Sequence, residues 1–245
     1  MKDKYAGDVN DFAKYGLLRW LASGPERLRL GVIWYLTPEA PGGDGGRVQY
    51  LSTAEPNRFS SADRELFQKL GAIVADQQRS TAEIARRDIL PADTVYYAEP
   101  IVSRRRAEWF LAGSEALSGC DLVFLDPDNG LAPPQRAKAA AMHATLDEVQ
   151  ALRSQGHSVV VIQFLNRRAA HVMQLRTWLS QVSLHSHDLL PAPWAFHWRT
   201  GSSLGFMIIP STRHAATLVK RLQSLAHSPW AGLFDVYVNE PAPDA

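Results

Sequence analysis

The sequence holds a single cysteine, Cys120, among its 245 residues. A lone thiol forms no intramolecular disulfide, and it excludes a zinc site built from several cysteines. Long apolar runs are missing too, since no stretch approaches the roughly 20 residues that span a bilayer. The first five residues, MKDKY, lack the apolar core of a signal peptide. We therefore expect a cytoplasmic protein without a membrane partner.

Charge of one sign is not in excess either. The chain carries 26 Lys and Arg against 25 Asp and Glu, a formal net charge of +1. This balance excludes an overall basic field for nucleic acid but is compatible with a local basic groove. The length suffices for one α/β domain with a full core. We find no internal repeat, and we expect one domain over residues 1–239 and a frayed tail over 240–245.

Hydrophobic periodicity divides the chain into alternating helices and strands. Apolar residues at steps of three and four mark helices, and short β-branched or aromatic runs mark strands. We expect helices over 8–21, 62–77, 104–117, 135–155, 169–182 and 212–226. We expect strands over 30–36, 81–86, 94–101, 158–165, 194–199 and 204–210, and one ending at 126. Residues 200–203, TGSS, favour a hairpin turn between the last two strands.

This order of elements predicts the fold class. Alternating strands and helices indicate a parallel sheet with right-handed crossovers and helices on its faces. A terminal antiparallel hairpin on such a sheet is typical of Rossmann-like methyltransferases, whose last strand is inserted antiparallel. We therefore expect an α/β protein, a Rossmann-like, methyltransferase-type three-layer sandwich with a mostly parallel sheet and a C-terminal antiparallel hairpin. Another doubly wound domain with an antiparallel edge is the alternative.

The most informative segment is a strand that ends in a polar turn. Four apolar residues, 122–125, lead into Asp126-Pro127-Asp128-Asn129-Gly130. Ligands of open α/β sheets bind outside the carboxyl ends of the strands. A carboxylate there can accept hydrogen bonds from a substrate amine and stabilise positive charge on its nitrogen. We therefore predict that Asp126, Asp128 and Asn129 are catalytic. The alternative is a turn that only shapes the chain.

Residues 6–14, AGDVNDFAK, resemble the amino-terminal motif of bacterial methyltransferases that modify adenine in large-subunit ribosomal RNA. That motif begins Ala-Gly-Asn and continues with an acid and a lysine on the first helix. Asp8 replaces the asparagine here, whereas the acid and the lysine match. In that family the segment helps to hold S-adenosylmethionine. The resemblance implies cofactor contacts from Gly7, Asn10, Asp11 and Lys14, with the lysine meeting the cofactor's carboxylate.

Two further segments extend the resemblance. The turn at Asp126 lies where amino-methyltransferases carry an acid or asparagine, two prolines and an aromatic residue. The closing hairpin, with GSSLG at 201–205, is also similar to that family. Asp128 and Asn129 depart from the pattern, and no G-x-G-x-x-G follows the first strand. The segments GDVNDFAKYGLLR and LVFLDPDNGL also resemble a set of bacterial and phage proteins without an established activity.

Polar residues elsewhere widen the candidate site. Glu99 is expected to accept the ribose hydroxyls of a nucleoside cofactor, with Asp88 as a rival. Substrate contacts are expected from the end of a glycine-rich loop and from two strand ends: Asp44, Arg47, Asn166 and Trp198. Loop amides can cradle an anion, and an indole can stack a base. Arginines favour a rim for phosphates: Arg86, Arg87, Arg104, Arg105, Arg106, Arg167 and Arg168.

Three hypotheses follow. The first is an S-adenosylmethionine-dependent methyltransferase that acts on an amine nitrogen of a nucleic acid or nucleotide, with Asp126 orienting the acceptor and no metal. The second is a nuclease or phosphotransferase in which Asp126 and Asp128 bind Mg²⁺ and arginines hold phosphate. The third is a binding protein that kept the fold without the chemistry.

Overall fold

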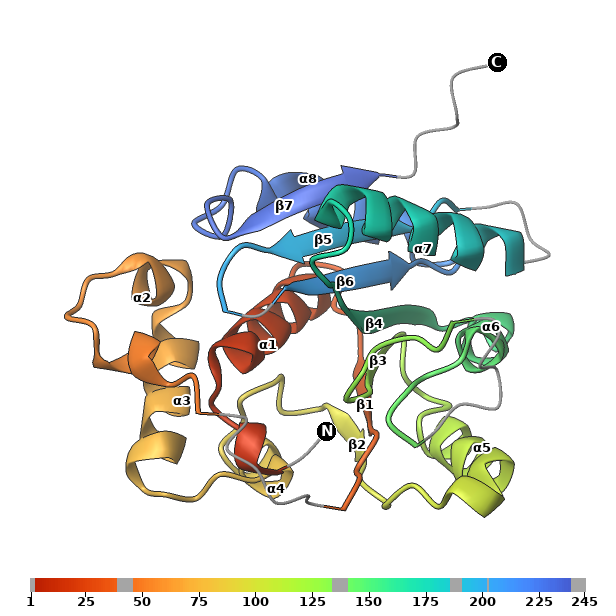
Figure 1. The fold of residues 1–245 in the computed structure, drawn as a ribbon, viewed down its shortest axis with the longest axis horizontal. Coiled ribbons are helices and arrows are strands. Elements are labelled where there is room, and N and C mark those ends of the chain that lie inside the picture. Colours follow the sequence, from red (N-terminus) through yellow and green to blue (C-terminus); the bar gives the residue numbers. More distant parts are fainter. Residues whose placement is uncertain (1–2, 39–45, 134–140, 186–190, 202, 239–245) are drawn as a thin grey trace.

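A single seven-stranded sheet organises the computed structural model, which describes residues 3–38, 46–133, 141–185, 191–201 and 203–238 (Figure 1). The strand order is β2-β1-β3-β4-β6-β5-β7. The strands are β1 Leu30–Trp34, β2 Val95–Tyr97, β3 Leu122–Asp126, β4 Ser158–Phe164, β5 Trp194–Trp198, β6 Leu204–Ile209 and β7 Phe234–Val238. The pairs among β1 to β4 are parallel, and those among β4, β6, β5 and β7 are antiparallel.

This topology gathers the carboxyl ends of five strands at one edge. β6 runs antiparallel between β4 and β5, so β5 points the same way as β1 to β4. Trp34 at the end of β1 is the register partner of Asp126 at the end of β3. Trp198 ends β5 opposite Leu204, which in turn faces Phe164 at the end of β4. Side chains far apart in sequence therefore meet along this edge.

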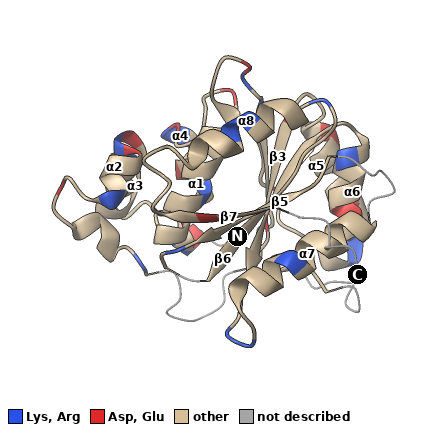
Figure 2. Cartoon of the chain, turned by 90° about the horizontal axis from the view of Figure 1, so that it is seen from above, with Lys and Arg blue, Asp and Glu red and all other residues tan. Residues whose placement is uncertain are grey.

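Helices cover both faces of the sheet, as Figure 2 shows from above. The helices are α1 Val9–Ala22, α2 Arg58–Ala62, α3 Arg64–Ala75, α4 Thr81–Arg86, α5 Arg106–Ala116, α6 Leu146–Ser154, α7 His171–His185 and α8 Ala215–Leu225. One buried apolar cluster joins α1, α3 and α8 to one face, and a second joins α5, α6 and α7 to the other. The expected α/β class, with a mostly parallel centre and an antiparallel C-terminal part, is confirmed.

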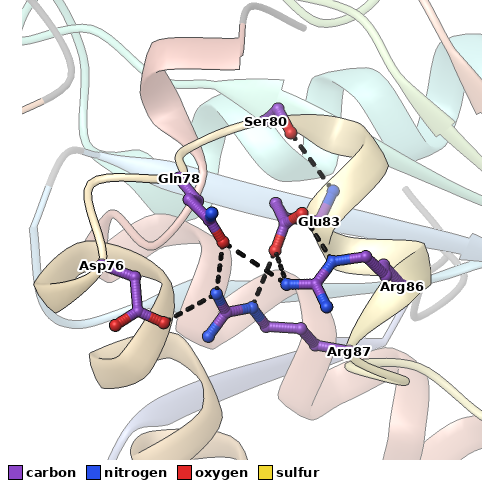
Figure 3. A network of polar contacts seen from close by, with 6 residues as sticks. All are labelled: Asp76, Gln78, Ser80, Glu83, Arg86 and Arg87. Atoms are coloured by element: carbon purple, nitrogen blue, oxygen red, sulfur yellow. Dashed lines mark hydrogen bonds and ion pairs between the residues drawn. The ribbon is translucent and has the colours of Figure 1, made fainter.

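The segment 81–86 is the helix α4, so the expected strand there is wrong. Ser80 caps this helix, because its side chain accepts a hydrogen bond from the backbone N–H of Glu83. Glu83 then pairs with Arg86 and with Arg87, one helical turn further on (Figure 3). Pairs at three- and four-residue spacing stabilise helices and have no counterpart in a strand. The cap and these ion pairs stabilise a helix here, although the β-branched residues of the segment favour a strand.

Of the helix expected over 135–155, residues 135–140 lie outside the described residues, and the described part holds α6 from Leu146 to Ser154. Thr145 and Glu148 form a capping box, in which each side chain accepts a hydrogen bond from the other's backbone N–H. This box fixes the start of α6, and residues 141–145 before it are not helical. The expected strand 94–101 is shorter in the structure, and α2 and β7 were not expected. The hairpin of β5 and β6 is confirmed as an antiparallel pair.

Across the residues with a described structure, no helix is long and apolar enough to cross a membrane. The tail 240–245 lies outside those residues.

Candidate functional site

The two segments that the sequence singles out meet in a buried ion pair. The Lys14 Nζ atom lies 2.9 Å from Oδ1 and 3.1 Å from Oδ2 of Asp126. The same ammonium lies 3.2 Å from Oδ1 of Asp11, one helical turn earlier in α1. The side chains of Lys14, Asp126 and Asp11 are only 6%, 1% and 1% exposed. The start of α1 and the end of β3 are thus locked together at the carboxyl edge of the sheet.

Burial and mutual charge set the protonation states of this cluster. Burial raises the pKa of Asp11 to about 6, against the lowering effect of Lys14. Burial by itself lowers the pKa of Lys14, but the carboxylates of Asp126 and Asp11 outweigh it and raise that pKa overall, so the ammonium stays charged. Burial and the same carboxylates raise the pKa of Tyr15 well above its ordinary value. Tyr15 is therefore a neutral hydroxyl beside a cluster of charges.

Gly7 and Asp11 shape the entry to α1. The backbone N–H of Gly7 donates to Oδ2 of Asp11 at 3.2 Å, and its carbonyl accepts from the Tyr50 hydroxyl at 3.2 Å. Gly7 has a φ of +85°, and a Cβ built on it would lie 2.7 Å from Cγ2 of Val74. Asp8 caps the helix by accepting from the N–H of Asn10 at 2.8 Å. Only glycine suits this conformation and this close contact.

The turn after β3 is held from the neighbouring strand. The Thr37 hydroxyl, just beyond β1, donates to Oδ2 of Asp128 at 2.7 Å. Asn129 is exposed, and its backbone N–H donates to the carbonyl of Met142 at 2.8 Å. Gln163 of β4 accepts from the N–H of Leu131 at 2.8 Å. Asp126 and Asp128 therefore point to different partners. Thr37 and Gln163 were not expected, although both lie at the carboxyl ends of apolar strands.

A second polar corner lies beside the first turn of α1. A Cβ built on Gly201, whose φ is +84°, would lie 2.9 Å from Oδ1 of Asn10 and 3.6 Å from Nε1 of Trp198. Trp198 is 1% exposed, and its ring packs against Phe59 and Phe234 at centroid distances of 6.5 and 5.0 Å. The indole thus shows no ring face on which a base stacks, and Trp198 is a core residue.

Near α1, three buried polar atoms make no hydrogen bond within the described part of the chain. They are the Tyr15 hydroxyl, Nε1 of Trp198 and Oγ1 of Thr200. A buried polar group without a partner costs about 1–3 kcal/mol, so such groups are rare and call for an explanation. Tyr15 and Thr200 had not been expected in the site. The only sequence signal for Tyr15 is its position next to Lys14, and the only one for Thr200 is its position just after β5.

The remaining candidates surround this edge without joining the cluster. Glu99 is exposed beyond β2, and its carbonyl accepts from Nε1 of Trp109 at 2.8 Å. Arg47 is exposed, but its carbonyl accepts from the N–H of Val9 at 3.1 Å, which places it at the start of α1. Asn166 is exposed after β4 and bonds through its side chain to the N–H of Arg168. Asp44 lies outside the described residues.

Three of the seven arginines expected at a phosphate rim form ion pairs elsewhere. Arg87 pairs with Asp76 and Glu83 in the network on α4, where Gln78 also accepts from it (Figure 3). Arg106 pairs with Glu148 at 2.8 Å, on the other face of the sheet. Figure 2 shows basic and acidic residues mixed over the helices. Arg86, Arg87 and Arg106 are thus engaged in structural pairs away from the Lys14 cluster.

The carboxylates at the edge do not make an evident Mg²⁺ site. Searched over its described residues, the chain shows no group of three or more His, Cys, Asp or Glu that could hold a metal ion. The Lys14 ammonium lies between Asp11 and Asp126, where a bridging cation would have to lie. Asp128 turns to Thr37 instead.

Two other features lie away from this edge. Ser211, His214 and Asp121 form a serine–histidine–aspartate chain at the opposite end of the sheet, with distances of 3.1 and 3.2 Å. Its serine also contacts Ser158 of β4 through both its backbone N–H and its hydroxyl, so this chain of side chains ties the start of β4 to the segment before α8. A cavity of about 480 Å³ lies between α1, the junction of α2 and α3, and α8. It contains none of the residues of the Lys14 cluster.

No protein-family model and no curated protein matches this chain. A crystal structure of a Legionella pneumophila protein of the family model DUF519 is similar to it over 97% of this chain and 98% of that one. The sequence identity is 14% and the TM-score is 0.44. This degree of similarity assigns neither a fold family nor an activity.

Proposed function

We propose that this protein is an S-adenosylmethionine-dependent methyltransferase that acts on an amine nitrogen of a nucleic acid or nucleotide. The observation that carries the proposal is the contact of Lys14 with Asp126. It joins the segment that the family resemblance assigns to the cofactor with the turn that the resemblance assigns to the acceptor. The two segments are 112 residues apart in the sequence, and a shared site accounts for their meeting.

The order of the strands supports the same proposal. An antiparallel strand, β6, is inserted between β4 and β5, next to a parallel set with β1 and β3 at its centre. This is the arrangement expected of a methyltransferase-type Rossmann-like sheet. β7 adds a further antiparallel strand at the edge beyond β5. The chain places β2 on one side of β1 and β3 on the other, so the strand order reverses between β1 and β3, and such sheets bind ligands at that point.

The polar groups at the start of α1 fit the cofactor. Nε1 of Trp198 and Oγ1 of Thr200 are buried and make no hydrogen bond to any described residue, and the Trp198 nitrogen lies in the corner formed by Gly201 and Asn10. We assign them the amino-acid end of the cofactor, whose carboxylate accepts hydrogen bonds. Lys14 takes a different role from the one that the resemblance implies. Because it already pairs with two carboxylates, it positions Asp126 and neutralises part of its charge.

Asp126 would then receive the acceptor amine. S-adenosylmethionine supplies a methyl group on a cationic sulfur. Asp11 and Asp126 place two buried carboxyl groups against one ammonium, and the charge of buried Asp8 also acts on Asp11, an arrangement that favours a cation at this edge. The Asp126 carboxylate accepts a hydrogen bond from the amine and stabilises the positive charge that grows on its nitrogen. Positioning and exclusion of water supply the rest of the rate increase.

Titration calorimetry of the full chain with S-adenosylmethionine tests the cofactor. We expect one-site binding that Thr200→Val weakens by about tenfold, the effect of losing about 1.4 kcal/mol of hydrogen bonding. Thr177→Val is the matched control, because the exposed Thr177 hydroxyl only bonds to the carbonyl of Met173 in α7. Absence of binding at about millimolar ligand contradicts the proposal, as does equal weakening by the two variants.

Methyl transfer from labelled cofactor to RNA, DNA and free nucleotides tests the acceptor. We expect Asp126→Asn to lower turnover while cofactor affinity changes little, since asparagine still accepts one hydrogen bond but carries no charge. Asp121→Asn is the control, an acid just before the same strand at the opposite edge. Binding without transfer to any acceptor would support a binding protein instead.

A further inference from the structure

A histidine pair lies on the face of the sheet opposite α1. His171 begins α7 and His197 lies on β5, and Nδ1 of His171 is 3.0 Å from Nε2 of His197. Both side chains are partly buried. The two elements pack against each other across the second apolar cluster. The pair is therefore held by secondary structure on both sides.

A carboxylate fixes the proton positions in this pair. Oδ2 of Asp235 on β7 lies 3.2 Å from Nδ1 of His197. Asp235 in turn accepts from Nε of Arg199 at 2.7 Å, and this hydrogen bond lowers the pKa of Asp235, so the carboxylate stays ionised. An ionised carboxylate only accepts hydrogen bonds, so Nδ1 of His197 carries the proton. Nε2 of His197 then presents its lone pair to His171.

The protonation of His171 is also biased. Nε2 of His197 offers a lone pair at 3.0 Å from Nδ1 of His171, so the hydrogen of this contact lies on the His171 nitrogen. A neutral imidazole that faces a bare nitrogen donates its Nδ1 proton to that nitrogen. Nε2 of His171 then keeps a free lone pair, since within the described residues no hydrogen bond to it is present. One proton thus lies between two nitrogens that both bind metals when bare.

The spacing of the two nitrogens matches that of two ligands on one ion. Imidazole nitrogens lie about 2.0–2.1 Å from zinc, so two of them are about 2.9 Å apart at a right angle and about 3.4 Å apart at a tetrahedral angle. The observed separation of 3.0 Å falls between these values. The ring centroids are 4.7 Å apart, which is shorter than if the two nitrogens pointed straight at each other. The two rings are therefore tilted relative to the line that joins the nitrogens. A small rotation then directs both lone pairs to one point.

We propose that His171 and His197 bind one divalent transition-metal ion of the class that prefers imidazole, such as Zn²⁺, Ni²⁺ or Cu²⁺. The ion replaces the proton between Nδ1 of His171 and Nε2 of His197, and that proton moves to Nε2 of His171. Asp235 orients His197 from outside the coordination sphere, as carboxylates do for many metal-binding histidines. Water fills the other positions, because within the described residues no third His, Cys, Asp or Glu joins the pair.

The site is separate from the proposed methyltransferase function. Lys14 and its partners belong to the α1 face and the ends of β1 and β3, whereas the histidines lie between α7 and β5. Mg²⁺ prefers oxygen ligands and is not expected to bind here. Metal binding and cofactor binding can therefore fail independently of each other.

Calorimetry with Zn²⁺, Ni²⁺ and Mg²⁺ at pH 7 on the full chain tests the proposal. We expect one Zn²⁺ or Ni²⁺ per chain and no response to Mg²⁺. His171→Gln and His197→Gln should each weaken binding at least about tenfold, and Asp235→Asn should weaken it by about tenfold through the outer sphere. His185→Gln is the control, because this histidine lies at the other end of α7 and pairs with Asp147.

Nitrogen NMR of the imidazole rings distinguishes metal binding by the histidines from a change in folding. Zn²⁺ should shift Nδ1 of His171 and Nε2 of His197 in the wild-type chain while the backbone signals of β5 and α7 stay in place. The proposal is overturned if neither metal binds at about millimolar concentration. It is also overturned if the two histidine variants, shown to be folded by circular dichroism, bind as tightly as His185→Gln.

Discussion

Lys14 reaches across 112 residues of sequence to place its ammonium 2.9 Å from the Asp126 carboxylate. Lys14 belongs to the first turns of α1, and Asp126 is the last residue of β3. Their contact brings two short sequence motifs together in one candidate site. The lysine side chain in this contact is almost completely buried. A buried ion pair is costly to break, because each partner loses the other's charge without regaining its hydration.

Lys14→Met should destabilise the fold strongly. The variant leaves the Asp11 and Asp126 carboxyl groups buried together without a cation, and losing one partner of a buried pair costs about 3–5 kcal/mol. Urea unfolding measures the loss. Arg27→Met is the control, because the pair of Arg27 with Asp93 is exposed and such pairs contribute about 0–1 kcal/mol. Equal losses in the two variants would mean that the Lys14 pair is solvated.

Asp11 should titrate near pH 6 in the folded protein. Its pKa is raised from 3.8 to about 6 by burial, so folding favours the protonated form. The contribution of this group to stability is therefore complete below about pH 4 and is lost as the pH rises through 6. Carbon NMR of the side-chain carboxyl should show the midpoint, and Asp11→Asn should remove that signal. A midpoint below about 4 would show that Lys14 dominates over burial.

Gly16→Ala should be destabilising although it lies within a helix. Alanine is favoured over glycine inside a helix by about 1 kcal/mol. At Gly16, however, a Cβ would lie 2.0 Å from Cη2 of Trp230, whose ring is packed against Phe12 and Phe234. Overpacking costs about 1–3 kcal/mol, so the net effect is a loss.

Gly71→Ala in α3 is the matched control for Gly16. Its Cβ would meet only Cδ2 of Leu51, at 3.9 Å, so we expect no loss or a small gain in thermal stability. If both variants gain stability, the contact of α1 with Trp230 is looser than the structure shows.

Thr37→Val should free the turn after β3 while the fold stays intact. The variant keeps the shape of the side chain and removes the hydroxyl that donates to Asp128. We expect a change of about 1 kcal/mol or less in stability but weaker cofactor binding or slower methyl transfer, because Asp128 and its neighbours lose their fixed position. Calorimetry and the transfer assay report the two effects. Unchanged binding and transfer would show that Asp128 has no part in the site.

Strong local patterns predicted most of the fold. The apolar runs that became β1, β3, β4 and β6 are buried along almost their whole length, so their type was clear. Weak patterns failed where side chains beyond the segment decide. The sequence at 81–86 contains both strand and helix formers, and the Ser80 cap with the Glu83 pairs selects the helix.

The candidate site divides in the same way. Gly7, Asp11, Lys14 and Asp126 stand out in the sequence as charged or special residues at element ends, and the structure brings them together. Trp198 also stood out, but alternation along a strand does not reveal that Phe59 and Phe234 cover its ring. Tyr15, Thr37 and the His171–His197 pair show no local signal, because their partners come from other elements.

The sequence by itself determined the alternation of strands and helices, the buried character of the central strands and the polar turn at Asp126, because local periodicity and turn chemistry act over a few residues. Only the tertiary structure decided that Lys14 pairs with Asp126, that Trp198 is buried and that His171 meets His197. Those contacts depend on strand order and on which helix covers which face of the sheet. Burial then changes the energetics, since charges and hydrogen-bonding groups removed from water are governed by their nearest neighbours and no longer by the solvent.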